Sequence, residues 1–265
     1  MTYRFYGQHG EDYLLWHFFD FRSDGFFVDI GAHDGVSLSN TKSFEEQGWQ
    51  GICVEPIPEV ARACGEVRKR VVQAACVAGP ENTVSLRVDR TGLWAGISTD
   101  EQVVAKSYQE RGSGEPDFRS IDVPAMRAAE LLAPQDPPID FVSLDVEGTE
   151  IDVLEGFDLG RNQPRLLLVE ALTQEALGAL DDYLRRFGYM RARTVTCNHF
   201  YVLSRSDALK LQCITIDCAL TVPILPGYGP AGLGTRAWSA PTTSSRIGFV
   251  AGKLRQRYRR LLRGI

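Results

Sequence analysis

An unbroken apolar run that ends at a glycine turn is the clearest pattern in the chain. Residues 26–30 are Phe-Phe-Val-Asp-Ile, and they lack the polar alternation of a half-exposed strand. Such a run predicts a strand buried on both faces, as in a parallel sheet. Gly31 and Gly35 then bracket a turn where glycine tolerates positive φ and lets a ligand approach the backbone. Residues 37–48 follow with helical character, so this stretch predicts the first half of a nucleotide-binding α/β unit.

Apolar strands and helices continue to alternate along the chain. Leu177, Leu180 and Leu184 recur at helical spacing, which predicts an amphipathic helix over residues 173–187. The other expected helices are residues 58–69 and 149–157, and the other expected strands are 51–54, 71–77, 83–88, 138–144, 165–170, 189–194 and 198–203. We therefore expect an α/β fold with a Rossmann-like sheet of about seven strands, mostly parallel with an antiparallel last strand, and helices on both faces.

Three segments divide the chain around this sheet. Residues 1–24 predict a cover helix at the sheet edge, and residues 25–203 form the predicted main domain, with an insertion at about 79–123 that suits a lid or an acceptor wall. Residues 204–265 begin as a Pro- and Gly-rich extension. They end in a basic amphipathic helix, which either lies on an anionic membrane surface or packs on its own subunit or a dimer mate.

Composition narrows the functional classes. The formal net charge of −5 argues against a general nucleic-acid binder. Six cysteines are scattered without C-x-x-C pairs, so neither a disulfide framework nor a zinc site is expected and a reducing cytosol fits. We expect no signal peptide, and no apolar run of the sequence approaches membrane-spanning length. The expected location is cytoplasmic, with contact to the inner membrane surface if the basic tail lies on lipid.

The glycine turn has the pattern D-x-G-x-x-x-G rather than the dinucleotide pattern G-x-G-x-x-G. Asp29 on the strand suits a cofactor with a cationic amino-acid part, as in S-adenosylmethionine. Glu55 ends the next strand, where a carboxylate can accept both ribose hydroxyls of an adenosine. Ser39 and Asn40 lie near an expected helix N-terminus, which suits the methionine carboxylate, although a plain N-cap is the alternative. The other alternative is that the glycines merely cap a strand and Glu55 is a solvated strand end.

Several of these stretches resemble one family. Residues 28–35, 39–41 and 54–56 are similar to the FkbM family of S-adenosylmethionine-dependent methyltransferases, as are residues 7–12, 144–150 and 168–170. The resemblance runs from about residue 6 to about residue 203. It implies that Gln8 and Asp12 fold over the cofactor, against the simpler view that the first helix only covers the sheet. It also implies a methyltransferase sheet and O-methylation, commonly of a sugar hydroxyl. His33 departs from the glycine found at the middle of many methyltransferase turns.

Acids at strand ends supply the remaining candidates. Asp145 and Glu147 follow one expected strand and Glu170 ends the next, on the edge where open α/β sheets bind ligands. Asp145, Glu147 and His199 are the candidate catalytic residues, and Asp145 with Glu170 is the candidate site for Mg²⁺. The expected acceptor is a small molecule or a glycan. The alternatives are a non-sugar acceptor such as a peptide, polyketide or lipid headgroup, and a catalytically silent cofactor-binding module.

Overall fold

The computed structural model describes residues 3–89, 95–97, 117–215 and 237–238. The predicted basic C-terminal helix, most of the Pro- and Gly-rich extension and the centre of the predicted insertion lie outside these residues. Within them, the short strand β1 (Tyr3–Arg4) pairs antiparallel with β13 (Ala237–Trp238). No helix among the described residues is long and apolar enough to cross a membrane.

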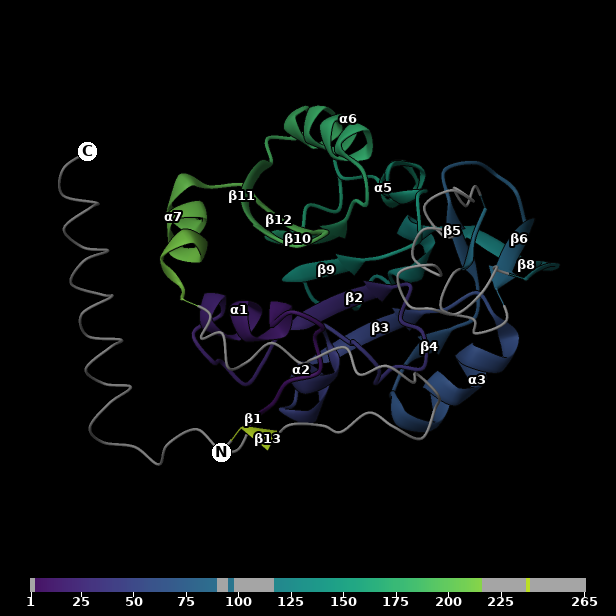
Figure 1. The fold of residues 1–265 in the computed structure, drawn as a ribbon. Helices are drawn as coiled ribbons and strands as arrows, with labels where there is room; N and C mark the ends of the chain where they lie inside the picture. Colours follow the sequence, from purple (N-terminus) through teal and green to yellow (C-terminus); the bar gives the residue numbers. More distant parts are fainter. Residues whose placement is uncertain (1–2, 90–94, 98–116, 216–236, 239–265) are drawn as a thin grey trace.

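A seven-stranded sheet forms the centre of the molecule (Figure 1). Its order is β11-β12-β10-β9-β2-β3-β4. Only β12 runs against the others, because it pairs antiparallel with both β10 and β11. The predicted α/β fold with a mostly parallel sheet is therefore confirmed. The strands are β2 (Phe26–Ile30), β3 (Gln50–Val54), β4 (Val71–Val72), β9 (Phe141–Leu144), β10 (Leu166–Glu170), β11 (Met190–Val195) and β12 (Asn198–Val202).

Helices cover both faces of this sheet. Alternate side chains of each strand pack into two separate hydrophobic cores, one on each face. On one face α5 (Glu150–Phe157) and α6 (Gln174–Arg185) pack on side chains such as Val28 and Val169. On the other face α1 (Glu11–Phe18), α2 (Lys42–Glu46), α3 (Pro58–Val67) and α7 (Arg205–Cys213) contribute buried side chains to the core that contains Phe27 and Leu168. Below, the first is called the α6 face and the second the α1 face.

A smaller sheet with the order β5-β8-β6-β7 stands beside the main one. Its strands are β5 (Ala75–Val77), β6 (Thr83–Asp89), β7 (Ala95–Gly96) and β8 (Phe118–Arg127), and a 3-10 helix, η1 (Ala128–Leu131), follows. The prediction of one strand over residues 71–77 is wrong: β4 pairs with β3, whereas β5 pairs with β8. Gln73 and Ala74 separate the two, so the chain leaves the main sheet there.

Helix α7 occupies residues that we expected to belong to the extension. Ser204 caps it, because its Oγ accepts a hydrogen bond from the Asp207 N–H at 3.1 Å. Ala208 and Leu211 are buried in the core of the α1 face. The Pro- and Gly-rich composition that predicted an extension begins only after this helix.

Candidate active site

The glycine turn, residues 31–35, lies against the end of β9. Gly31 has φ +87°, and a Cβ added there would lie 1.7 Å from the carbonyl oxygen of Asp145. At Gly35 (φ +77°) it would lie 2.6 Å from Cγ of Arg68 and 2.8 Å from Sγ of Cys64. Packing within the protein therefore already requires glycine at both positions. A contact of either residue with a cofactor stays a prediction.

Gly31→Ala should therefore destabilise the protein by about 2–5 kcal/mol, from left-handed strain plus overpacking. Gly178→Ala is the matched control, because a Cβ there meets nothing within 4 Å and the residue is exposed on α6. The control should be slightly stabilising, by about 0.5–1 kcal/mol. Urea unfolding measures both changes, and equal stabilities for the two variants would contradict the packing described for Gly31.

Asp29 points to the α1 face and is 5% exposed. Its carboxylate accepts a hydrogen bond from the Thr41 hydroxyl and lies 3.9 Å from the guanidinium of Arg68. Burial raises its pKa, and the charge of Arg68 opposes that shift. A buried arginine of the protein therefore already supplies a positive charge beside Asp29, and direct contact of Asp29 with a cationic cofactor stays a prediction.

Arg68 was not a candidate from the sequence, yet it holds the loop after the glycine turn in place. It is 5% exposed and donates to the carbonyl of Gly35 at 3.0 Å, to Thr41 Oγ1 at 2.8 Å and to Glu45 Oε2 at 3.1 Å. One guanidinium therefore places its positive charge beside both Asp29 and Glu45 and fixes the backbone of the turn.

The helix expected over residues 37–48 is much shorter, since α2 is only Lys42–Glu46. The Ser39 hydroxyl oxygen accepts the N–H groups of Thr41 (3.2 Å) and Lys42 (3.0 Å), so Ser39 caps the chain ahead of α2. A contact of Ser39 with a cofactor stays a prediction. Asn40 differs from it. Its Nδ2 donates to Ser143 Oγ at 3.2 Å, and its buried Oδ1 has no hydrogen-bond partner among the described residues. A cofactor contact through Asn40 remains a prediction.

Glu55 lies next to the turn, as expected, and is 4% exposed. Its two oxygens accept the N–H groups of His33 (3.0 Å) and Ile57 (2.9 Å). A carboxylate oxygen can accept more than one hydrogen bond, so acceptance of ribose hydroxyls stays a prediction. His33 itself has φ +49°, and Asp34 raises its pKa despite burial, which acts the other way.

The pKa of Glu55 gives a test of this environment. Desolvation by burial raises it from 4.5 to about 7. The folded state therefore binds this proton more tightly than the unfolded state does. The resulting stabilisation is complete below about pH 4.5 and is lost as the pH rises through about 7. Between these values the free energy of unfolding of wild type should fall relative to that of Glu55→Gln.

Urea unfolding at several pH values measures this difference. Glu59→Gln is the control, because Glu59 is exposed and Arg119 lowers its pKa. The control should follow wild type across the same window. Parallel pH profiles for wild type and Glu55→Gln would contradict the shift at Glu55.

The acids at the ends of β9 and β10 form one group, here called the acidic cluster: Asp145, Glu147 and Glu170. One oxygen of each lies within 4.8 Å of the others. Desolvation by the surrounding protein atoms raises the pKa of Asp145 well above its usual range, and the charge of Glu170 adds to the shift, although the residue is exposed at the surface. Desolvation, followed by the charge of Glu147, raises the pKa of Glu170 to about 7. The spatial grouping of these three predicted residues is thus present in the structure.

The turn before β12 brings further polar groups to Glu170. The Cys197 thiol donates to Glu170 Oε1 at 3.2 Å, and Asn198 is the register partner of Glu170. Neither was a candidate, because only the strand pairing places them there.

His199 is not placed for the predicted catalytic role. Side chains alternate along a strand, so it faces away from Asn198 and towards the α6 face. It is 3% exposed, its Nδ1 lies 2.9 Å from Thr194 Oγ1, and desolvation lowers its pKa. A buried residue on the opposite face from Glu170 cannot act as the base at the acidic cluster.

The N-terminal segment reaches the same edge of the sheet. Gln8 is half-buried in the loop before α1. Asp12 is completely buried and accepts the N–H groups of Tyr6 (2.6 Å) and Tyr13 (2.9 Å), and burial raises its pKa to about 7. The Asp12 carboxylate thus organises the loop, and its implied contact with a cofactor stays a prediction. The corresponding role of Gln8 stays a prediction.

Residues 29–190 match the family described as the methyltransferase FkbM domain. The matched segment spans the glycine turn, Glu55, the acidic cluster and most of the sheet. The chain belongs to the FkbM methyltransferase family. The suspected resemblance is confirmed, and this FkbM methyltransferase has its candidate site at the carboxyl ends of β2, β3, β9 and β10.

No functionally curated protein matches this FkbM methyltransferase. Solved structures that are similar to it include a precorrin-6y C5,15-methyltransferase from Geobacter metallireducens (12% identity, 72% of this chain and 84% of that chain, TM-score 0.39). A second is a putative RNA methyltransferase from Pyrococcus horikoshii (12% identity, 73% of this chain and 81% of that chain, TM-score 0.39). A third is a ribosomal protein L11 methylase from Lactobacillus delbrueckii subsp. bulgaricus (10% identity, 71% of this chain and 74% of that chain, TM-score 0.37). At these TM-scores no conclusion about the acceptor rests on them.

Proposed function

We propose that this protein is an S-adenosylmethionine-dependent O-methyltransferase that methylates a sugar hydroxyl of a glycan, a glycolipid or a glycosylated natural product. The observation that carries the proposal is the acidic cluster, whose three carboxylates lie within 4.8 Å of one another beside the glycine turn of a methyltransferase domain. Sugar hydroxyls are hydrogen-bond donors, and carboxylates accept from them. An anionic acceptor would instead be repelled by this cluster.

The chemistry requires removal of a proton as the new bond forms. S-adenosylmethionine supplies an activated methyl group: the S–CH₃ bond breaks, its electron pair stays on sulfur, and the acceptor oxygen forms the new bond to carbon. Asp145 takes the hydroxyl proton, and its raised pKa makes it a stronger base than an ordinary aspartate. Glu147 and Glu170 hold neighbouring hydroxyls and so align the acceptor oxygen with the methyl group.

The methyl donor would bind across the ends of β2 and β3. The backbone of the glycine turn lines one side of the donor site, and Glu55 accepts hydrogen bonds from the ribose hydroxyls. The ionised form of Glu55 is the stronger acceptor. Because its pKa is raised to about 7, binding of the donor should tighten as the pH rises through that value.

The acidic cluster also fits a hard divalent cation. Mg²⁺ prefers oxygen ligands, and Asp145, Glu147 and Glu170 each offer a carboxylate oxygen within 4.8 Å of the other two. Bound there, the ion would lower the pKa of a coordinated hydroxyl. Binding of Mg²⁺ to the protein without an acceptor, measured by calorimetry, tests this part separately from activity.

The test of the proposal is transfer of a labelled methyl group from S-adenosylmethionine to a panel of acceptors. Free sugars, glycosides and glycolipids should be labelled, and the label should resist the mild alkali that cleaves methyl esters. Labelling only of peptides, polyketides or unglycosylated lipids would overturn the sugar acceptor. Binding of S-adenosylhomocysteine with no transfer to any acceptor would favour the silent module.

A further inference from the structure

The carboxylate of Glu11 connects two parts of the chain that are far apart in sequence. Glu11 is 0% exposed, at the start of α1. One of its oxygens accepts the backbone N–H of His9 at 2.7 Å, and the other accepts the side-chain amide of Asn198 at 2.9 Å. Glu11 and Asn198 are 187 residues apart, so this bond is a tertiary contact and not part of the local capping of α1.

Asn198 places this contact beside the acidic cluster. It is the register partner of Glu170 in the antiparallel pair of β10 and β12. Partners in such a pair present their side chains to the same face of the sheet. Cys197, the residue before Asn198, donates to Glu170 at 3.2 Å. Glu11 therefore holds the N-terminal segment next to a residue of the proposed acceptor site.

The other end of the same segment is attached near β9. Gly7 forms a bridge with Leu38, and a Cβ added at Gly7 would lie 3.2 Å from Oδ1 of Asn40. Asn40 in turn donates to Ser143 on β9. The sheet order places β10 between β9 and β12. Residues 7–10, here called the strap, thus pass across the end of β10 on the α1 face, where Glu170 lies.

We propose that Glu11 is a positioning residue that fixes the strap between the acidic cluster and the loop of Leu38 and Asn40 that follows the glycine turn. Through its end at this loop, the strap forms one side of the site for the methyl donor and its product. This inference rests on the proposed function, since it concerns the same site. Glu11 does not touch the ligand. It acts by holding the strap backbone and the side chains of Gln8 and His9 in one place. The simpler view is that Glu11 only attaches α1 to the sheet, and then its removal would lower stability without a specific effect on the ligand.

The experiment measures binding of S-adenosylhomocysteine by calorimetry, together with amide hydrogen exchange of the strap. Glu11→Ala should weaken binding about tenfold, in the range usual for coupling between two sites. It should also speed exchange at residues 7–10 in the free protein. Glu11→Gln should restore most of the affinity, because its carbonyl can accept from His9 and its amide can pair with a turned Asn198 side chain.

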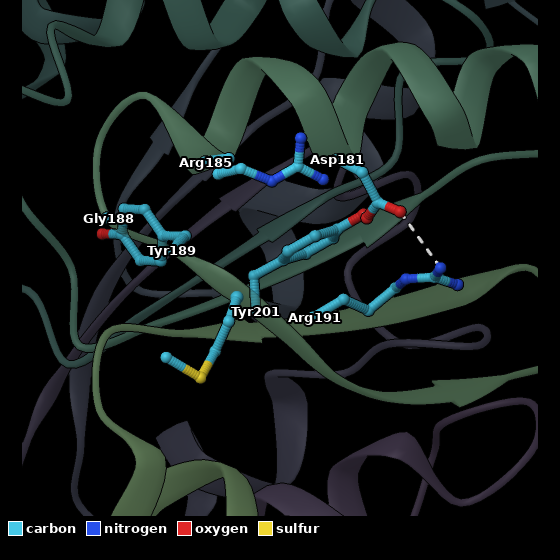
Figure 2. Close-up of a pocket in the computed structure, with 7 residues that line it drawn as sticks. Asp181, Arg185, Gly188, Tyr189, Arg191 and Tyr201 are labelled. Atoms are coloured by element: carbon cyan, nitrogen blue, oxygen red, sulfur yellow. Dashed lines mark hydrogen bonds and ion pairs between the residues drawn. The ribbon is translucent and has the colours of Figure 1, made fainter.

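Asp181→Ala is the matched control. Asp181 is a carboxylate that also accepts two bonds, from Tyr201 Oη at 2.7 Å and from Arg191 at 3.0 Å. Asp181 lines a hollow of about 400 Å³ between α6 and the strands β11 and β12, on the α6 face. Figure 2 shows its side chain beside Tyr201 and Arg191. Its removal should leave both the affinity and the exchange of the strap unchanged. Asn198→Ala removes the hydrogen bond from β12 to Glu11 and leaves Glu11 in place. This variant replaces Glu11→Ala in the experiment if Glu11→Ala does not fold.

The outcomes separate the two proposals. Failure of wild type to bind S-adenosylhomocysteine would contradict the proposed function. Normal binding by wild type with unchanged affinity in Glu11→Ala or Asn198→Ala would overturn the role of Glu11 alone. Weaker binding without faster exchange in the strap would overturn it as well, since Glu11 would then act through another part of the structure.

Discussion

Replacement of Arg68 by alanine is expected to destabilise the protein by about 3–5 kcal/mol, the usual result of removing one partner from a buried charge network. The Arg68 side chain is fully buried and faces Asp29 and Glu45. Without it both carboxylates remain buried with no positive partner, and the Gly35 carbonyl and the Thr41 hydroxyl lose a donor. Urea unfolding of wild type and variant measures the change.

The control for this prediction is an arginine on the surface. Arg119 pairs with Glu59, and the two side chains are 58% and 53% exposed. Arg119→Ala should cost no more than about 1 kcal/mol, because exposed ion pairs contribute little. A loss below 1 kcal/mol in Arg68→Ala as well would show that Arg68 does not hold the glycine turn in the way described.

Asp145→Asn is expected to lower methyl transfer by about 10²–10⁴-fold, the usual contribution of a general base. An amide keeps the shape of the side chain but cannot take the acceptor's proton. Binding of S-adenosylhomocysteine should be retained, because the product needs no proton transfer. Single-turnover transfer to the acceptor found by labelling, together with calorimetry of the product, separates these two effects.

Asp152→Asn is the matched control for Asp145. Asp152 lies in the first turn of α5, and its carboxylate accepts the N–H of Ala78 at 3.2 Å. This change should leave transfer within about threefold of wild type, since amide oxygens also accept such bonds. Equal rates for Asp145→Asn and wild type would remove Asp145 from the mechanism. Loss of product binding in Asp145→Asn would instead make it a binding residue.

The sheet could be predicted from the sequence because its strands are marked by short apolar runs. Runs such as Phe26–Ile30 are buried on both faces, and an apolar run is what burial on both faces requires. The acids at the ends of β9 and β10 could be grouped for a similar reason, since parallel strands end on one edge. The family resemblance then added the kind of reaction.

Contacts between side chains that are far apart in sequence could not be predicted in the same way. Arg68 follows α3 and has no local feature that marks it as the partner of Asp29, so Asp29 was assigned to a ligand. His199 has the residue type of a base, but only the register of β12 shows that it faces away from Glu170. Glu11 lies in the first turn of α1, where an acidic residue is favourable without any tertiary partner, and its bond to Asn198 depends on a contact 187 residues away.

Local hydrogen bonds explain the remaining differences. The helix expected from residue 37 begins only at Lys42, because Asp34 accepts the N–H groups of Val36 and Ser37 and Ser39 caps the chain ahead of α2. Side chains of this kind compete with the helix for backbone N–H groups. Residues 37–48 have helical propensity, but hydrogen bonds from backbone N–H groups to the Asp34 and Ser39 side chains delay the start of the helix to Lys42.

Binding of S-adenosylmethionine at the carboxyl end of this sheet is tested most directly by urea unfolding of wild type with S-adenosylhomocysteine, beside NAD as a control. At a concentration of about 100 times its Kd, the product should raise the free energy of unfolding by about 2.7 kcal/mol. NAD should have no effect, and Glu55→Gln should respond less than wild type. Stabilisation by NAD, or no stabilisation by S-adenosylhomocysteine, would contradict the account.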